Sequence, residues 1–171
     1  MILYAFVLAY AYLSPKLPID TANGYYLYDN TKAEIKEGTN WISIKDMSPY
    51  IIDATIAIED KNFYNHQGFD YLRIIKALFI NAKNRKNLQG ASTITQQYAK
   101  NLFLNFDKTW SRKIEEAFLT MRLEAHYSKD EILEGYLNTI NYGGIFGIEN
   151  ASKYYFNKSS KDLTLAEASI L

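Results

Sequence analysis

The sequence predicts a mainly α fold of about seven helices, with one short hairpin near the N-terminus. Two observations predict this class. Apolar residues recur at helical spacing in most segments of the chain. Capping boxes, in which Ser or Thr is followed three residues later by Glu or Gln, begin three of these segments, at Thr93, Ser128 and Thr164. The chain has 171 residues, 48% of them hydrophobic, which is enough for a domain with its own core.

The composition excludes several classes of function. The formal net charge is zero, so no overall field attracts the chain to nucleic acid, and we expect no nucleic-acid partner. The chain has no cysteine, which excludes disulfides and thiolate metal sites. Its two histidines, His66 and His126, do not have a metal-binding spacing. The sequence itself therefore requires no cofactor.

The first 13 residues, MILYAFVLAYAYL, carry no charge and lack the basic start of a signal peptide. As a helix they would span about 20 Å, less than the roughly 30 Å of a bilayer core. A buried core helix is one interpretation. We favour the other, a partial membrane anchor over residues 1–13. Residues 14–50 then form a linker and lead-in, because SPKLP breaks the helix and YYLYDNTKAEI alternates around a polar turn, as a hairpin does.

Two helices are predicted at the start of the remaining domain, residues 51–171. Pro49 begins the first, which ends near Glu59. The second, residues 71–87, has a wide apolar face beside Lys76, Lys83, Arg85 and Lys86. This pattern suits a helix lying at an acidic membrane surface. A helix packed on the core explains the same residues equally well.

The segment QGASTITQQYAKNLF, residues 89–103, combines a helix start with polar residues. Thr93, Gln97 and Lys100 follow i, i+4, i+7 spacing and share one helix face. A hydroxyl, an amide and an ammonium group near a positive helix N-terminus could hold an anion. A solvated polar face is the alternative.

A long helix is predicted over residues 111–127, with a buried stripe that includes Ile114, Phe118 and Met121. Arg112 and Glu116 on this helix are spaced i, i+4, which also suits an ordinary surface ion pair. Further helices are predicted after Ser128, over IENASKYYF and from Thr164. Because the last of these reaches Leu171 after fewer than two turns, we expect the domain to be truncated at its C-terminal end.

Two glutamates on separate helices, Glu59 and Glu116, suggest glycosyl chemistry. One carboxylate can deprotonate an attacking hydroxyl while another group assists the departing oxygen. A phosphate leaving group needs cations more than an acid, and Lys100, Arg112 and Lys113 would supply them. Helix ends also collect acidic residues, so a structural role for Glu59 is the alternative.

Five blocks of the sequence resemble the peptidoglycan glycosyltransferase domain, glycosyltransferase family 51, of class A penicillin-binding proteins and monofunctional transglycosylases. In order they are EDKNFYNHQGFD, GASTITQQYAKNLFL, RKIEE, KDEILEGYLNTINYGG continuing to ASKYYF, and LTLAEASIL, which is cut short. Tyr98 stands where that family usually has leucine. The resemblance covers about residues 25–171.

The resemblance implies roles for individual residues. Glu59 would be the general base that takes the proton of the acceptor sugar's 4-hydroxyl. Glu116 would be a second essential glutamate on the diphosphate side of the donor. The residues expected to shape the site or bind substrate are Asp60, Phe63, His66, Ser92, Thr93, Gln96, Gln97, Lys100, Asn101, Arg112 and Lys113.

The resemblance also implies a fold, a reaction and partners. The fold is a lysozyme-like helical lobe with a smaller, membrane-associated hydrophobic lobe. The reaction joins lipid II units into β-1,4 glycan strands with inversion and releases undecaprenyl diphosphate, on the outer face of the bacterial cell membrane. Moenomycin-type compounds inhibit such domains, some of which contain a divalent cation, Mg²⁺ or Mn²⁺. A transpeptidase domain or partner accompanies the glycosyltransferase domain in bifunctional members.

Two alternatives to this polymerase interpretation stay open. A truncated chain could bind lipid II or moenomycin without catalysis, because missing helices would leave apolar surface unburied. A lysozyme-like enzyme would cleave finished glycan and would need no cationic site for diphosphate.

Overall fold

The mainly α class is confirmed by the structure, a computed structural model that describes residues 2–17, 19, 26–29, 32–35, 40–84, 90–104 and 109–171. The described residues form eight α-helices, one more than expected, with three short 3-10 helices and two strand pairs. The helices are α1 (Ile2–Leu13), α2 (Pro49–Glu59), α3 (Tyr71–Asn84), α4 (Ile94–Phe103), α5 (Trp110–His126), α6 (Lys129–Thr139), α7 (Ile148–Phe156) and α8 (Leu165–Ala168), and the 3-10 helices are η1 (Ile44–Asp46), η2 (Phe63–Asn65) and η3 (Ser160–Asp162).

Both strand pairs are antiparallel and short. Strand β1 (Tyr26–Asp29) pairs with β2 (Lys32–Ile35), and Asp29 lies opposite Lys32. The two residues between these strands lie outside the described part of the chain. The second pair, β3 (Asn141–Tyr142) and β4 (Ile145–Phe146), reverses the chain between α6 and α7. It occupies the glycine-rich segment NYGGIFG, residues 141–147.

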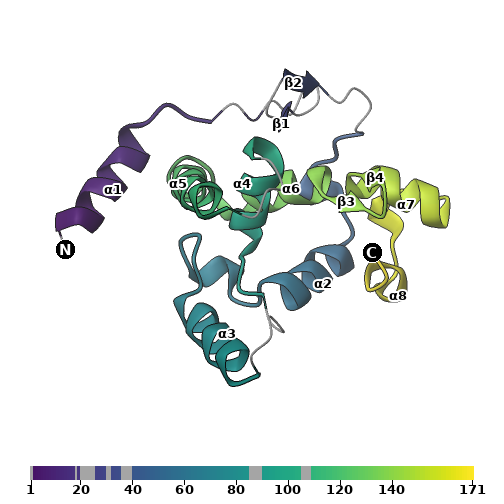
Figure 1. Ribbon diagram of the computed structural model, residues 1–171. Coiled ribbons are helices and arrows are strands. Elements are labelled where there is room, and N and C mark those ends of the chain that lie inside the picture. The colour runs from purple at the N-terminus through teal and green to yellow at the C-terminus, as the bar shows by residue number, and fades with distance from the viewer. Residues whose placement is uncertain are drawn as a thin grey trace.

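Helix α4 lies at the centre of the fold and packs against α5 and α6 (Figure 1). Tyr98 on α4 is fully buried among Ile132, Leu133 and Leu137 of the core. A Cβ atom at Gly135 on α6 would lie 2.1 Å from the Tyr98 hydroxyl oxygen, which is closer than atoms can approach. The absence of a side chain at this position therefore lets α6 approach the buried tyrosine.

The three predicted capping boxes are all confirmed. Thr93, Ser128 and Thr164 each accept a hydrogen bond from the backbone three residues later, and the residue there bonds back to the cap. Thr93 differs from the other two because it is fully buried, and its hydroxyl also donates a 2.7 Å hydrogen bond to the carbonyl of Gly68. The cap at Thr93 thus fixes the start of α4 to the loop before α3.

The predicted buried stripe of α5 is wrong at Ile114 and Phe118, whereas Met121 is partly buried. Ile114 and Phe118 are exposed, and the helix buries Glu116, Thr120 and Leu123 instead. The helix is rotated about its axis relative to the orientation predicted from its apolar stripe, because Glu116 faces inward with cationic partners. A buried carboxylate is tolerated when it is paired and hydrogen-bonded. The Thr120 hydroxyl bonds to the carbonyl of Glu116, so the polar groups on this face are satisfied.

Part of the apolar stripe on α5 faces α1 instead. The rings of Tyr10 and Phe118 meet edge to face, with centroids 6.0 Å apart. Ala11 is buried, its carbonyl lies 3.1 Å from His126 Nε2, and Arg122 donates a 2.7 Å hydrogen bond to the carbonyl of Pro15. Among the described residues, no helix is both long and apolar enough to cross a membrane. The partial anchor therefore stays a prediction.

Helix α3 leaves its apolar face exposed. Ala77 is the buried residue of this helix, whereas Leu72, Ile75, Leu78 and Phe79 are all more than half exposed. The helix lies at the lower edge of the view in Figure 1, away from α4 and α6. The sequence allowed this helix either to lie at a membrane surface or to pack on the core. The exposure of these four residues contradicts packing on the core.

Candidate active site

The C-terminus of α2 presents Glu59, as the sequence predicted. Asp60, the next residue, ends the helix with φ −159° and is fully buried. Its carboxylate lies 3.0 Å from His66 Nε2 and accepts a 3.1 Å hydrogen bond from the backbone amide of Ile94 at the start of α4. Asp60 therefore holds the end of α2 against the N-terminus of α4. Glu59 lines a cavity of about 90 Å³ that Tyr136 and Ala168 also line.

The carboxylate of Glu59 is oriented by a chain of two hydrogen bonds. Gln97 Nε2 donates to Glu59 Oε2 at 2.6 Å, and the Tyr136 hydroxyl donates to Gln97 Oε1 at 3.3 Å. Burial raises the pKa of the Tyr136 hydroxyl well above its ordinary value, and the nearby charge of Glu59 raises it further, so the hydroxyl stays a donor. From the other side, Arg73 on α3 donates to the backbone carbonyl of Glu59.

Glu116 is 2% exposed and is paired through both carboxylate oxygens. Arg112 Nη1 lies 2.9 Å from Oε2, and the ammonium of Lys113 bonds to Oε1. Lys113 also donates to the Ser92 hydroxyl at 3.4 Å. Thr109 caps α5 through the backbone amide of Arg112, so these residues share the first two turns of that helix. Glu116 thereby positions two cations at the start of α5.

Lys100 connects the two glutamates electrostatically. Burial lowers the pKa of Lys100, and the charges of Arg112 and Lys113 act in the same direction. The charges of Glu116 and Glu59 act in the opposite direction, so both carboxylates lie within electrostatic range of this ammonium. The structure thus brings together Glu59, Gln97, Lys100, Arg112, Lys113 and Glu116, which are separate in the sequence.

Comparison with known proteins places the chain in a family. Residues 28–171 match the family described as Transglycosylase. The chain belongs to the transglycosylase family. Penicillin-binding protein 2D of Bacillus subtilis is 54% identical over 162 residues, which make up 92% of this chain and 23% of that protein. The biosynthetic peptidoglycan transglycosylases of Mannheimia succiniciproducens and Haemophilus influenzae are each 50% identical, over 81% and 77% of this chain.

The chain spans only part of these relatives. It covers 57% of the Mannheimia protein and 54% of the Haemophilus protein, and about a quarter of the penicillin-binding protein. These matches show the family to which the chain belongs.

Several residues expected to bind substrate in this transglycosylase have structural partners. Thr93 and Gln96 are buried in the capping box of α4, and Phe63 is fully buried in the core. His66 contacts Asp60, while Asn101 lies half-buried on α4 beside Lys100. Thr93, Gln96 and Phe63 are thus buried, whereas Ser92, Gln97 and Lys100 are only partly buried.

Two residues that contact Glu59 or its hydrogen-bond partner, Tyr136 and Arg73, were not predicted from the sequence. Tyr136 lies beside the core residues Ile132, Leu133 and Leu137 on α6, so the local pattern does not separate it from a core tyrosine. Arg73 lies on a helix whose charges suggested a membrane surface. Only the packing of α3 against the end of α2 reveals its contact with Glu59.

A metal ion does not fit at Glu116. Arg112 and Lys113 already engage both oxygens of this carboxylate. In the part of the chain that the structure describes, no group of three His, Asp or Glu side chains is placed to hold a metal ion. The reaction proposed below therefore includes no step through Mg²⁺ or Mn²⁺.

Proposed function

We propose that this transglycosylase polymerises lipid II into β-1,4 glycan strands with inversion and releases undecaprenyl diphosphate. The observation that carries the proposal is a hydrogen-bonded carboxylate, Glu59, and a cluster of cations around Glu116, with Lys100 within electrostatic range of both glutamates. A base for a hydroxyl and cations for a diphosphate are the two requirements of this transfer.

In the proposed reaction Glu59 acts as general base. Its carboxylate accepts the proton of the acceptor sugar's 4-hydroxyl as that oxygen attacks the anomeric carbon of the donor. The new C–O bond forms as the bond between the anomeric carbon and the diphosphate oxygen breaks, and the electron pair leaves with the diphosphate. The hydrogen bond from Gln97 holds the carboxylate of Glu59 in one orientation.

The leaving diphosphate would lie against Lys100, Arg112 and Lys113. Cations placed where charge develops stabilise the transition state without having to reorganise. Glu116 would act mainly by holding Arg112 and Lys113 in position, because its own oxygens are occupied by them. Ser92 would complete this cradle, since its hydroxyl lies within reach of Lys113.

Membrane association would come from α3. Its exposed apolar residues form one continuous face with Lys76 and Lys83 on the same helix, as in helices that lie at an anionic membrane surface. We propose that the domain works on the outer face of the bacterial membrane and is accompanied by a transpeptidase domain or partner.

The double substitution Ile75→Glu with Phe79→Glu should abolish flotation of the protein on anionic vesicles. Unchanged flotation would contradict this role of α3.

The decisive experiment is a polymerisation assay with lipid II in detergent, comparing wild type, Glu59→Gln and the matched control Asp53→Asn. Asp53 is exposed on the same helix and lies outside the site. Loss of a general base should lower the rate at least about a hundredfold, with the control unchanged. Moenomycin should block the wild type.

The other results would support the other functions. Polymerisation by Glu59→Gln at the wild-type rate would contradict the proposal. Release of muropeptides from purified cell wall would indicate a glycan-cleaving enzyme. Binding of moenomycin without polymer from any form would indicate a non-catalytic binding domain.

A further inference from the structure

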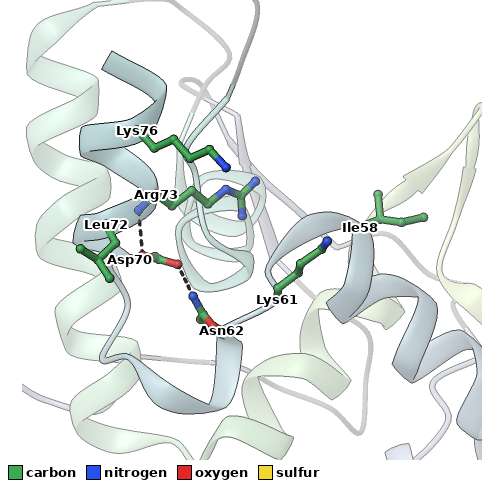
Figure 2. A pocket seen from close by; sticks show the side chains of 7 residues that line it. All are labelled: Ile58, Lys61, Asn62, Asp70, Leu72, Arg73 and Lys76. Atoms are coloured by element: carbon green, nitrogen blue, oxygen red, sulfur yellow. Dashed lines mark hydrogen bonds between the residues drawn. The ribbon is translucent and has the colours of Figure 1, made fainter. Parts of the chain in front are cut away.

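A second basic cavity lies between the end of α2 and the first turns of α3. Its volume is about 370 Å³. Figure 2 shows Arg73 and Lys76 extending side by side from α3, with Lys61 across from them on the turn after α2. None of these three cations belongs to the cradle formed by Lys100, Arg112 and Lys113.

The protein neutralises only part of the positive charge of this cavity, because one ionised carboxylate faces three cations. Its one lining carboxylate, Asp70, accepts 2.9 Å hydrogen bonds from the Arg73 backbone amide and from Asn62 Nδ2. These two bonds lower the pKa of Asp70 and commit both of its oxygens. No acidic side chain of the described residues forms an ion pair with Lys61 or Lys76.

Exposed apolar side chains border the cavity. Leu72 is 79% exposed and Ile58 is 69% exposed, and both line it. Ile75 and Phe79 extend the apolar surface along α3. A concentrated positive charge beside exposed hydrocarbon suits a ligand that carries a phosphate on an apolar chain.

We propose that Lys61, Arg73 and Lys76 bind the phosphate group of a lipid, at a site separate from the cradle around Lys100. Arg73 also donates to the backbone carbonyl of Glu59, so a ligand that contacts Arg73 lies close to the backbone of the residue proposed as the base. Two sources supply this chemistry: a lipid-linked diphosphate and the headgroup of an anionic phospholipid. The first source rests on the proposed function, and the second does not.

The test compares Lys61→Gln/Lys76→Gln with Lys45→Gln/Lys161→Gln in the full chain. All four lysines are exposed, and the control pair removes the same charge without lining the cavity. Arg73 is left in place because it holds the Glu59 carbonyl. Equilibrium dialysis measures how many geranyl diphosphate molecules each form binds. Flotation measures binding to phosphatidylcholine vesicles with and without phosphatidylglycerol.

We expect the cavity variant to bind one equivalent of geranyl diphosphate fewer than the control, because losing two charge-assisted contacts weakens this site about tenfold or more. The cavity variant could instead bind as many geranyl diphosphate molecules as the control and float less on phosphatidylglycerol vesicles. This result would assign the site to phospholipid headgroups. Cavity and control variants that agree in both assays would overturn the proposal. Neither assay needs turnover, so absence of polymer in the wild type would count against the proposed function alone.

Discussion

The side-chain amide of Gln97 donates a 2.6 Å hydrogen bond to the carboxylate of Glu59 and so joins the first turn of α4 to the end of α2. Tyr136 on α6 bonds in turn to the oxygen of the same amide. Three helices thus determine the direction of one carboxylate. Because the amide orientation is fixed at both ends, Gln97 can present only its N–H group to Glu59.

Replacing Gln97 by leucine should lower kcat of lipid II polymerisation by about 10- to 100-fold, the effect of losing a hydrogen bond to a charged group. Tyr136→Phe removes a longer bond one step further away, so its effect should be smaller. Steady-state kinetics separates the roles. A rise in KM at constant kcat for Gln97→Leu would indicate that this residue binds substrate and does not orient the base.

The caps at Thr93 and Thr164 offer a matched test of burial. Thr164→Ala removes an exposed cap and should lower the free energy of unfolding by about 1 kcal/mol. Thr93→Ala also leaves the buried carbonyl of Gly68 without its 2.7 Å bond, so the loss should be about 2–3 kcal/mol. Urea unfolding measures both. Equal losses would mean that the bond to Gly68 contributes nothing.

Gly135 should tolerate no side chain. Gly135→Ala places a methyl group against the Tyr98 ring in a packed core, which should cost about 1–3 kcal/mol of unfolding free energy. Gly90→Ala is the control, because nothing lies within 4 Å of a Cβ atom there. Thermal unfolding of both variants tests the contact. If the Gly135 variant were as stable as the Gly90 variant, α4 and α6 would not approach as closely as described.

Local signals in the sequence predicted the helices, their caps and Glu59 at a helix end, because these depend on neighbours a few residues away. The orientation of α5 was not predictable in this way. Its apolar stripe indicated one buried face, but burial of Glu116 with Arg112 and Lys113 selected another. The cavity of Lys61 and Lys76 likewise depends on how α2 meets α3, which no local pattern contains.

The pH dependence of donor binding should be determined by Lys100. Burial lowers the pKa of its ammonium. As the pH rises, Lys100 therefore loses its charge before the pH reaches the ordinary lysine pKa of about 10.4. We therefore expect KM for lipid II to rise with pH as Lys100 loses its proton. Lys100→Arg should move this rise to higher pH, because a guanidinium stays charged.

The rise in KM cannot be explained by a loss of stability that comes from Lys100, because deprotonation of Lys100 affects stability in the opposite direction. A lysine whose pKa is lower in the folded state binds its proton less tightly there than in the unfolded chain. Between the two pKa values the contribution of Lys100 to the free energy of unfolding therefore rises with pH. Donor affinity should fall while that contribution, measured as the difference between wild type and Lys100→Met, increases. An unchanged KM profile in Lys100→Arg would assign the alkaline limb to another group.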